Sequence, residues 1–147
     1  WVFAALTRTL DLMPKDAPNR AEYVKDFQDM AAALLPLQRK DGFYNVSLTD
    51  ESNFGGPELT GTSLFVYGMA WGIRSGLLPA SKYQKSVDKG WKAIDSCVQP
   101  NGFLAYVQGT GKEPKDGQPV TKTSVPNFED FGAGCYLLAG SEILKSK

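Results

Sequence analysis

Three polar residues stand at the start of the most apolar stretch of the chain. Glu58, Thr60 and Thr62 lead directly into a run of large apolar side chains that ends near Gly72. A carboxylate and two hydroxyls can hydrogen-bond the hydroxyl groups of a ligand. We interpret this polar helix start as the floor of a binding site, with Thr60 as the N-cap. Glu58 either accepts hydrogen bonds from a ligand or braces the turn.

A second polar group precedes the last apolar stretch. Phe128, Glu129 and Asp130 follow Asn127, which we expect to cap a helix. Carboxylates in the first turn of a helix complement its dipole, and this structural role explains them without a ligand. Alternatively, they line a cavity and hydrogen-bond a polar ligand.

Aromatic residues near the expected turns are the third signal. Trp1, Phe43 and Tyr44 lie at loop edges, where an aromatic ring can cover the apolar face of a sugar. Most of the other aromatic side chains are expected in the core. The candidate binding residues are therefore Trp1, Phe43, Tyr44, Glu58, Thr60, Thr62, Phe128, Glu129 and Asp130.

The composition excludes several classes of function. The chain has no histidine, which removes the commonest general base and the commonest metal ligand. We therefore expect no metal and no cofactor. Sixteen basic residues balance sixteen acidic ones and are interspersed with them, so neither nucleic acid nor a membrane surface is expected as a partner. These residues contain no signal peptide or membrane-spanning stretch, which says nothing about any sequence upstream.

Three local motifs carry little weight. Gly109 to Lys112 (GTGK) resembles a phosphate loop, but Glu113 and Pro114 follow where a hydroxyl residue and a helix are needed. The glycosylation triplet at Asn45 is of a kind that arises by chance. Cys97 and Cys135 each stand in an apolar helical context and are expected as buried thiols rather than a disulfide.

Five helices are expected to position these residues. Residues 1–13, 60–75 and 128–145 are apolar on nearly every side, which is typical of helices buried all round. Residues 19–39 and 81–98 carry one apolar stripe each and are expected on an outer surface. Residues 43–46 suit a short extended piece, and the loop over 104–126 is too long to be a mere connector.

An internal repeat of sixty residues runs through the chain. Tyr23 and Leu34 recur as Tyr83 and Ile94, and the DGF turn at residues 41–43 recurs as NGF. Buried and one-sided helices in alternation predict an all-α fold, a curved two-layer array of αα-hairpins. About two and a half hairpins are too few to close into a ring.

Four blocks of sequence resemble one enzyme family. They read DGFYNVSLTD, NFGGPELTGTSLFVYGMAWGI, AYVQGTGKEPKDGQP and VPNFEDFGAGCYLLAGSEI. Together they resemble the C-terminal part of the unsaturated rhamnogalacturonyl hydrolases, glycoside hydrolase family 105. The resemblance implies that residues 1–147 are the C-terminal portion of a single (α/α)6 toroid domain. It also implies a location in the bacterial cytoplasm or periplasm.

The resemblance further implies hydrolysis of the terminal Δ4,5-unsaturated galacturonyl residue from rhamnogalacturonan oligosaccharides. In such enzymes an aspartate of the N-terminal half protonates the C4=C5 vinyl ether and activates the water that adds to C5. No catalytic residue is therefore expected within this chain, which alone would be inactive. The nine candidates above would form one wall of the substrate cavity. A separate physical hypothesis is that free N–H groups at the start of the Thr62 helix bind the uronate carboxylate, which requires that Glu58 points to substrate hydroxyls instead. The partners would be the missing N-terminal half or a second copy of this chain.

Two rival interpretations stay open. A non-catalytic helical-hairpin module would bind a protein or glycan on its concave face. Another (α/α)6 enzyme is suggested by residues 38–43 (QRKDGF), which resemble the repeats of terpene cyclases. An upstream aspartate-bearing half of the toroid would separate the hydrolase from the module.

Overall fold

The computed structural model describes residues 1–113, 115–124 and 130–146, without the side chain of Asp130. It is built mostly of α-helix, which confirms the predicted all-α class. Two strands of two residues each pair in antiparallel fashion, Tyr44 with Glu58 and Asn45 with Pro57. The elements are α1 (Val2–Leu12), α2 (Arg20–Leu34), a short 3-10 turn (Leu35–Leu37), β1 (Tyr44–Asn45), β2 (Pro57–Glu58), α3 (Leu59–Arg74), α4 (Ala80–Asp95) and α5 (Asp130–Lys145).

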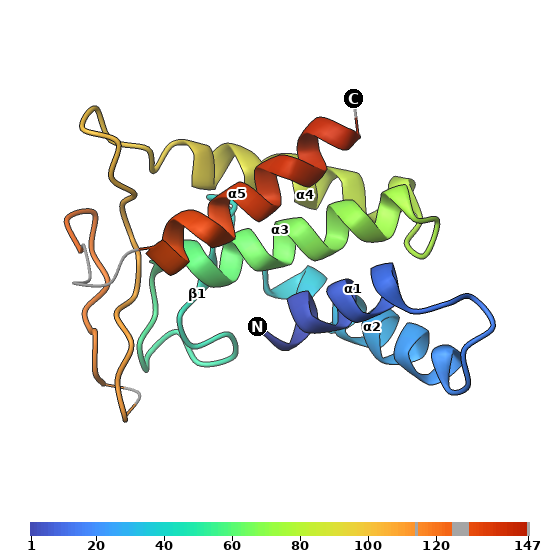
Figure 1. Ribbon diagram of the computed structural model, residues 1–147. Coiled ribbons are helices and arrows are strands. Elements are labelled where there is room, and N and C mark those ends of the chain that lie inside the picture. The colour runs from blue at the N-terminus through green and yellow to red at the C-terminus, as the bar shows by residue number, and fades with distance from the viewer. Residues whose placement is uncertain (114, 125–129, 147) are drawn as a thin grey trace.

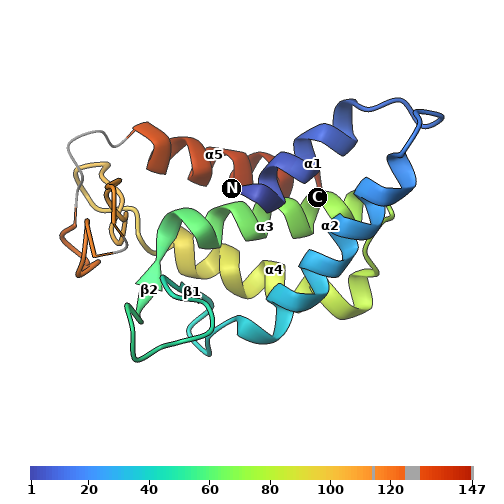
Figure 2. The ribbon, with the colours of Figure 1, turned by 90° about the horizontal axis from the view of Figure 1, so that it is seen from below.

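The helices lie in two layers. Figures 1 and 2 show α1, α3 and α5 side by side and running in the same direction, with α3 in the middle. The returning helices α2 and α4 run the opposite way and cover one side of that row. The chain therefore forms successive αα-hairpins, with the N-terminal ends of α1, α3 and α5 at one end of the molecule.

Helix α3 is the centre of the core, as its sequence predicts. Twelve of its sixteen residues are buried, so it has neighbours on nearly every side. A Cβ at Gly68 would lie 2.4 Å from the ring of Phe3, and one at Gly72 would lie 2.7 Å from Leu78. Glycine at these positions is what lets the neighbouring chain approach.

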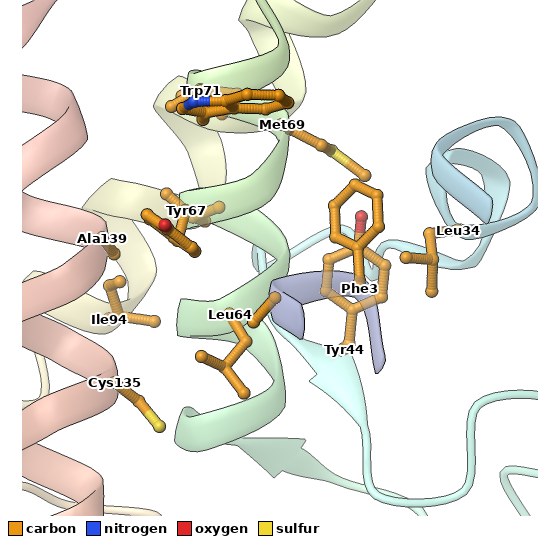
Figure 3. Packing of buried hydrophobic residues seen from close by; sticks show 14 of the residues in the cluster. Phe3, Leu34, Tyr44, Leu64, Tyr67, Met69, Trp71, Ile94, Cys135 and Ala139 are labelled. Atoms are coloured by element: carbon orange, nitrogen blue, oxygen red, sulfur yellow. The ribbon is translucent and has the colours of Figure 1, made fainter. Parts of the chain in front are cut away.

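Aromatic contacts tie the first hairpin to α3. The rings of Phe3 and Phe27 stack with centroids 4.9 Å apart, and Trp71 meets Phe27 edge-on at 5.4 Å. On the strand side, Tyr44 packs edge-on against Phe65 at 4.8 Å. Figure 3 shows Phe3, Tyr44 and Leu34 gathered on one side of α3, with Cys135 and Ala139 of α5 on the other.

Helices α1 and α5 differ from the prediction that they are buried all round. Val2 and Leu12 of α1 are exposed, and so are Leu137 and Leu144 of α5. Helix α1 packs on α2 and α3, and helix α5 packs on α3 and α4, but no described element covers the faces that carry these exposed side chains. Apolar side chains on these outer faces are therefore left exposed in the described part of the chain.

The helix starts also differ from the sequence prediction. The N-cap of α3 is Glu58 rather than Thr60, so this helix begins earlier than expected. Asn19 is the N-cap of α2, at the start predicted from the sequence, but its side chain makes no capping hydrogen bond. Helix α4 begins after Pro79 rather than at Ser81.

The sixty-residue repeat is confirmed in the turns that follow the outer helices. In the first turn, the N–H of Arg39 donates to Phe43 O (2.9 Å), that of Gly42 to Arg39 O (3.1 Å) and that of Phe43 to Asp41 Oδ1 (3.2 Å). The equivalent bonds over residues 99–103 measure 2.8, 2.8 and 3.1 Å. The glycine of each turn has a positive φ, 98° and 84°, which glycine adopts freely because it has no Cβ.

Two further predictions concern side chains and membranes. Cys97 and Cys135 are buried free thiols, as expected, and burial raises their pKa values to about 12 and about 11. Tyr23 is 39% exposed whereas its repeat partner Tyr83 is 3% exposed, so the two outer stripes are not buried equally. Among the described helices none is long and apolar enough to span a bilayer.

Candidate functional site

A hollow lies at the end of the molecule where the inner helices begin. Its volume is about 350 Å³. In Figure 1 this end also carries the long loop after α4 and the loop that holds β1. We call it the N-terminal hollow, and its lining residues are Trp1, Thr60, Gln108, Gly109, Thr110 and Phe131.

Two predicted site residues meet in the N-terminal hollow. Trp1 is the N-cap of α1, its carbonyl accepts the N–H of Ala5 at 2.9 Å, and its side chain is 70% exposed. Thr60 stands in the first turn of α3. Residues nearly sixty positions apart thus line one space because α1 and α3 are parallel neighbours.

Glu58 does not line the hollow, but its carboxylate hydrogen-bonds Thr60, which does. Its Oε1 accepts the N–H of Thr60 at 2.8 Å and the Thr60 hydroxyl at 2.7 Å, and its Oε2 accepts the N–H of Gly61 at 2.6 Å. The side chain therefore occupies the helix N–H groups that the sequence offered to a uronate carboxylate. The proposed anion site at this helix start is wrong, because a buried carboxylate already fills it.

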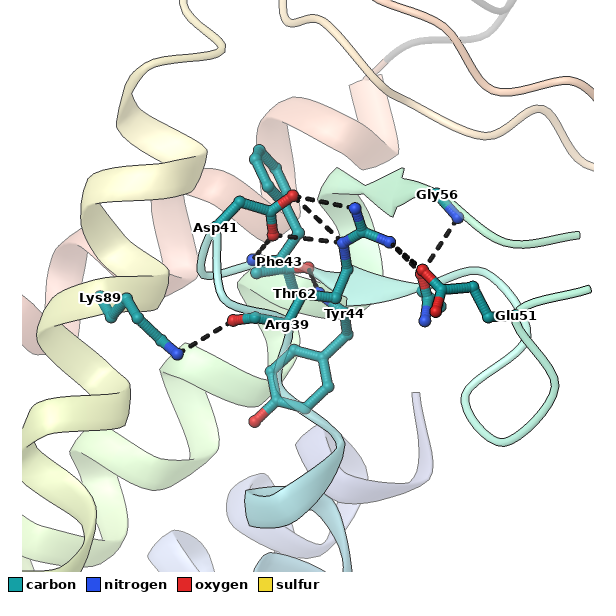
Figure 4. A network of polar contacts seen from close by, with 9 residues as sticks. Arg39, Asp41, Phe43, Tyr44, Glu51, Gly56, Thr62 and Lys89 are labelled. Atoms are coloured by element: carbon teal, nitrogen blue, oxygen red, sulfur yellow. Dashed lines mark hydrogen bonds and ion pairs between the residues drawn. The ribbon is translucent and has the colours of Figure 1, made fainter.

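Thr62 and Tyr44 are held inside the core rather than at the hollow. The Thr62 hydroxyl donates to Glu58 O at 2.6 Å and accepts the N–H of Tyr44 at 3.0 Å. Thr62 is 0% exposed and Tyr44 is 2% exposed, and burial raises the pKa of Tyr44 to about 12. These two residues fasten β1 to α3 (Figure 4). The structure gives their side chains a packing role, contrary to the predicted contact with a ligand.

Phe43 lies beneath the long loop. Its side chain is 8% exposed, and its ring packs against Tyr106 with centroids 5.8 Å apart. The DG turn thus positions Phe43 near the site end, but the loop covers the ring. The prediction that the Phe43 ring forms an open wall for stacking on a sugar is therefore wrong.

The chemistry available in the N-terminal hollow is recognition. An indole face, the hydroxyls of Thr60 and Thr110 and the amide of Gln108 suit a hydroxylated ligand with an apolar face. None of the six lining residues carries a titratable side chain. Among the described residues no cluster of histidine, cysteine or carboxylates could hold a metal ion. This part of the site can bind and orient a sugar but has no group to move a proton.

Comparison with known proteins settles the family. The model of glycosyl hydrolase family 88 matches residues 1–147. The chain belongs to this family. Among curated proteins it is 37% identical to an unsaturated 3S-rhamnoglycuronyl hydrolase of Formosa agariphila over 145 residues, 99% of this chain and 37% of the relative. An enzyme of the same name from Alteromonas sp. is 35% identical over 98% of this chain and 33% of its own length.

Three solved structures superimpose closely on this family 88 chain. A glycosyl hydrolase family 88 protein from Bacteroides vulgatus matches with a TM-score of 0.92 and 36% identity, over 100% of this chain and 42% of the other. A structure described as a polysaccharide lyase matches with a TM-score of 0.89 and 35% identity, over 99% and 40%. A possible family 105 member from Salmonella enterica shares the fold, with a TM-score of 0.82 and 23% identity over 99% and 38%.

These findings confirm the resemblance to unsaturated uronyl hydrolases. They also show that the family 88 chain spans about a third of the length of the curated relatives it matches.

Three of the predicted site residues remain predictions. Phe128 and Glu129 lie outside the described residues, and Asp130 begins α5 without a described side chain. Phe131, the next residue of α5, does line the N-terminal hollow.

Sequence reasoning missed the part of the hollow that comes from the long loop. Gln108, Gly109 and Thr110 line it, and the loop is fastened because the N–H of Leu59 donates to Tyr106 O at 2.9 Å. The length of the loop indicated that it is more than a connector, but it did not indicate which of its residues line the hollow. The GTGK motif overlaps this segment but forms a wall of the hollow instead of a phosphate loop.

Proposed function

We propose that this chain forms one wall of the substrate cavity in a complete family 88 hydrolase. That enzyme removes a terminal Δ4,5-unsaturated uronyl residue from rhamnose-containing oligosaccharides. Support comes from the family match over residues 1–147 and from the names of two curated relatives at 35–37% identity. The observation that carries the proposal for this chain is the N-terminal hollow, where an indole, two hydroxyls and an amide converge.

The proposed reaction is hydration of a vinyl ether. An aspartate outside this chain protonates C4 of the C4=C5 double bond, and water adds to C5. The resulting hemiketal opens, and the terminal residue separates from the rest of the oligosaccharide. In this scheme the side chains of the hollow orient the sugar, while the acid stands on the part of the enzyme that this chain does not contain.

The resemblance implies a galacturonyl residue, whereas the curated relatives are named for a rhamnoglycuronyl group, in which "glycuronyl" does not specify the uronic acid. Galacturonate and glucuronate differ only in configuration at C4, and the C4=C5 double bond removes that difference. The configuration at C4 therefore does not distinguish the galacturonyl group implied by the resemblance from the uronyl group in the names of the relatives. We propose the unsaturated uronyl residue as the recognised group and leave the following sugar to the assay.

The experiment is alanine substitution of the hollow in the full-length enzyme. Gln108→Ala and Trp1→Ala are expected to raise KM for an unsaturated uronyl-rhamnose disaccharide at least tenfold, with little change in the unfolding midpoint. Gln99→Ala is the matched control, because Gln99 lies outside the hollow and donates only its backbone N–H to the neighbouring turn. Unchanged KM in both hollow variants would remove these side chains from substrate binding.

A second candidate is a polysaccharide lyase. The observation in its favour is the solved structure described as a lyase at 35% identity. A lyase creates the C4=C5 double bond, and the proposed hydrolase consumes it. The direction of the ultraviolet absorbance change therefore separates the two functions.

A further inference from the structure

A small basic pocket on the outer helices has no part in the proposed function. Its volume is about 190 Å³, and it shares no lining residue with the N-terminal hollow. Four of its residues follow one face of α4 at helical spacing, and two come from the end of the first hairpin. We call it the lysine pocket, lined by Leu35, Gln38, Lys82, Lys85, Ser86 and Lys89.

The lysines of the pocket make no ion pair within the described part of the chain. Lys89 Nζ donates to the carbonyl of Arg39 at 2.9 Å (Figure 4), and Lys82 Nζ lies 5.3 Å from the centroid of the Tyr83 ring. None of the ion pairs among the described residues involves Lys82, Lys85 or Lys89. Three lysine residues thus line one small pocket, and none of them makes an ion pair with a carboxylate among the described residues.

The position of the pocket on α4 adds to this charge. Helix α4 has no acidic residue in its first turn and no side-chain cap, and Lys82 stands within that turn. The N-terminus of a helix carries a partial positive charge, so a lysine there is unfavourable where a carboxylate would be favourable. An oxyanion in the pocket would relieve both the helix end and the lysines.

The floor of the lysine pocket is fixed before any ligand arrives. The Gln38 amide donates to Gly42 O at 2.9 Å and to Ser86 O at 3.0 Å, and its oxygen accepts the Ser86 hydroxyl at 2.8 Å. This lattice joins the turn after α2 to α4. Because the floor is already ordered, binding would require only the lysine side chains to settle.

We propose that the lysine pocket binds a carboxylate of a uronic acid oligosaccharide, as a second saccharide site separate from the N-terminal hollow. The lysines of the pocket suit any oxyanion. The choice of a uronic acid among oxyanions rests on the proposed function. A space of about 190 Å³ holds roughly six water molecules, which is enough for a carboxylate and the nearest ring atoms. Long anionic chains would gain affinity from this pocket, whereas a disaccharide held by the hollow would contact none of its lining residues.

The test is calorimetric titration of the full-length protein at low salt with saturated digalacturonate, and separately with inorganic phosphate. The variant K82Q/K85Q leaves Lys89 and its bond to Arg39 intact. Its control, K15Q/K92Q, removes the same charge from residues that do not line the pocket. We expect digalacturonate to bind K82Q/K85Q at least tenfold more weakly than the wild type, and to bind the control within twofold of it.

Equal loss in the control, or no loss in K82Q/K85Q, would overturn the pocket as the site. Binding of phosphate without binding of digalacturonate would overturn the saccharide assignment. In the same preparations, kcat/KM for the unsaturated disaccharide should be unchanged in K82Q/K85Q, and a tenfold fall would contradict a separate site. If the wild type does not consume the disaccharide, the proposed function fails, whatever the titration shows.

Discussion

Glu58 is the residue on which sequence and structure differ most usefully. Capping preferences favour serine, threonine, asparagine and aspartate, so the sequence points to Thr60. The strand pairing of Glu58 with Tyr44 places its carboxylate over the helix end instead, where it takes three hydrogen bonds. Local rules could predict a polar helix start but not which residue caps it, because that depends on a strand formed by distant residues.

Glu58→Ala should therefore cost stability through the lost cap. The N–H groups of Thr60 and Gly61 would lose their acceptor, which typically costs about 1–2 kcal/mol. Urea unfolding of the wild type and the variant measures this difference. Asp16→Ala, an exposed carboxylate, is the control and should change the free energy of unfolding by less than about 0.5 kcal/mol. A variant as stable as the control would show that the cap is dispensable.

Glu142 predicts a pH dependence of stability. Burial pushes its pKa upward, but hydrogen bonds from Arg74 and Lys145, each 2.7 Å, outweigh burial and lower the pKa below its usual value. A carboxyl with a lowered pKa in the folded state stabilises that state above its unfolded pKa of about 4.3. This contribution is lost as pH falls through the folded pKa.

The variant Glu142→Gln checks that prediction. At neutral pH it should lose about 1–2 kcal/mol through weaker, uncharged hydrogen bonds, and the difference from the wild type should shrink as pH falls below about 4. Unfolding free energies across that range supply the measurement. Glu22→Gln, at an exposed position, is the control. A difference that stays constant with pH would contradict the lowered pKa.

At the scale of elements, hydrophobic patterning carried most of the prediction. It found all five helices, their alternation and the repeat, because 3.6-residue periodicity and glycine turns are local signals. It missed the exposed faces of α1 and α5, since an apolar helix does not reveal how many neighbours it has. It also missed Gln108, Gly109 and Thr110, because a loop without periodicity does not state its path.

The close approach of α1 and α3 predicts a sharp effect at Gly68. A methyl group there would lie 2.4 Å from the Phe3 ring and 3.0 Å from the Thr7 hydroxyl, so Gly68→Ala should destabilise the protein by about 1–3 kcal/mol. Gly134→Ala in α5 is the matched control, because nothing lies within 4 Å of its Cβ. Helix propensity alone should make it neutral or stabilising by up to about 1 kcal/mol.

Chemical denaturation of both variants separates packing from propensity. If Gly68→Ala and Gly134→Ala shift the unfolding midpoint in the same direction by similar amounts, the tight α1–α3 contact is not a feature of the folded protein.

At the scale of the whole molecule, helices α1 and α5 each have an apolar face that is exposed. Two grooves with volumes of about 620 and 450 Å³ run beside α1 and beside α5, and apolar side chains of these helices stand open at the surface. Surfaces of this kind favour association. We propose that they are covered by the remainder of a complete enzyme, or by a second copy when this chain is alone.

Sedimentation velocity of the isolated chain tests the second case. We expect self-association that rises with concentration, and we expect L137K/L144K to shift the chain towards monomer, because both leucines are exposed on α5. The control K15Q/K92Q should associate as the wild type does. A wild-type chain that stays monomeric at high concentration would contradict the prediction.

The most direct test of the central claim is the ultraviolet absorbance of the conjugated C4=C5 double bond, followed with the full-length enzyme on an unsaturated uronyl-rhamnose disaccharide. A falling absorbance, slowed in Gln108→Ala and restored by high substrate, is the predicted result. No change with the disaccharide, together with a rising absorbance on intact polysaccharide, would show a lyase and contradict the proposed hydrolase.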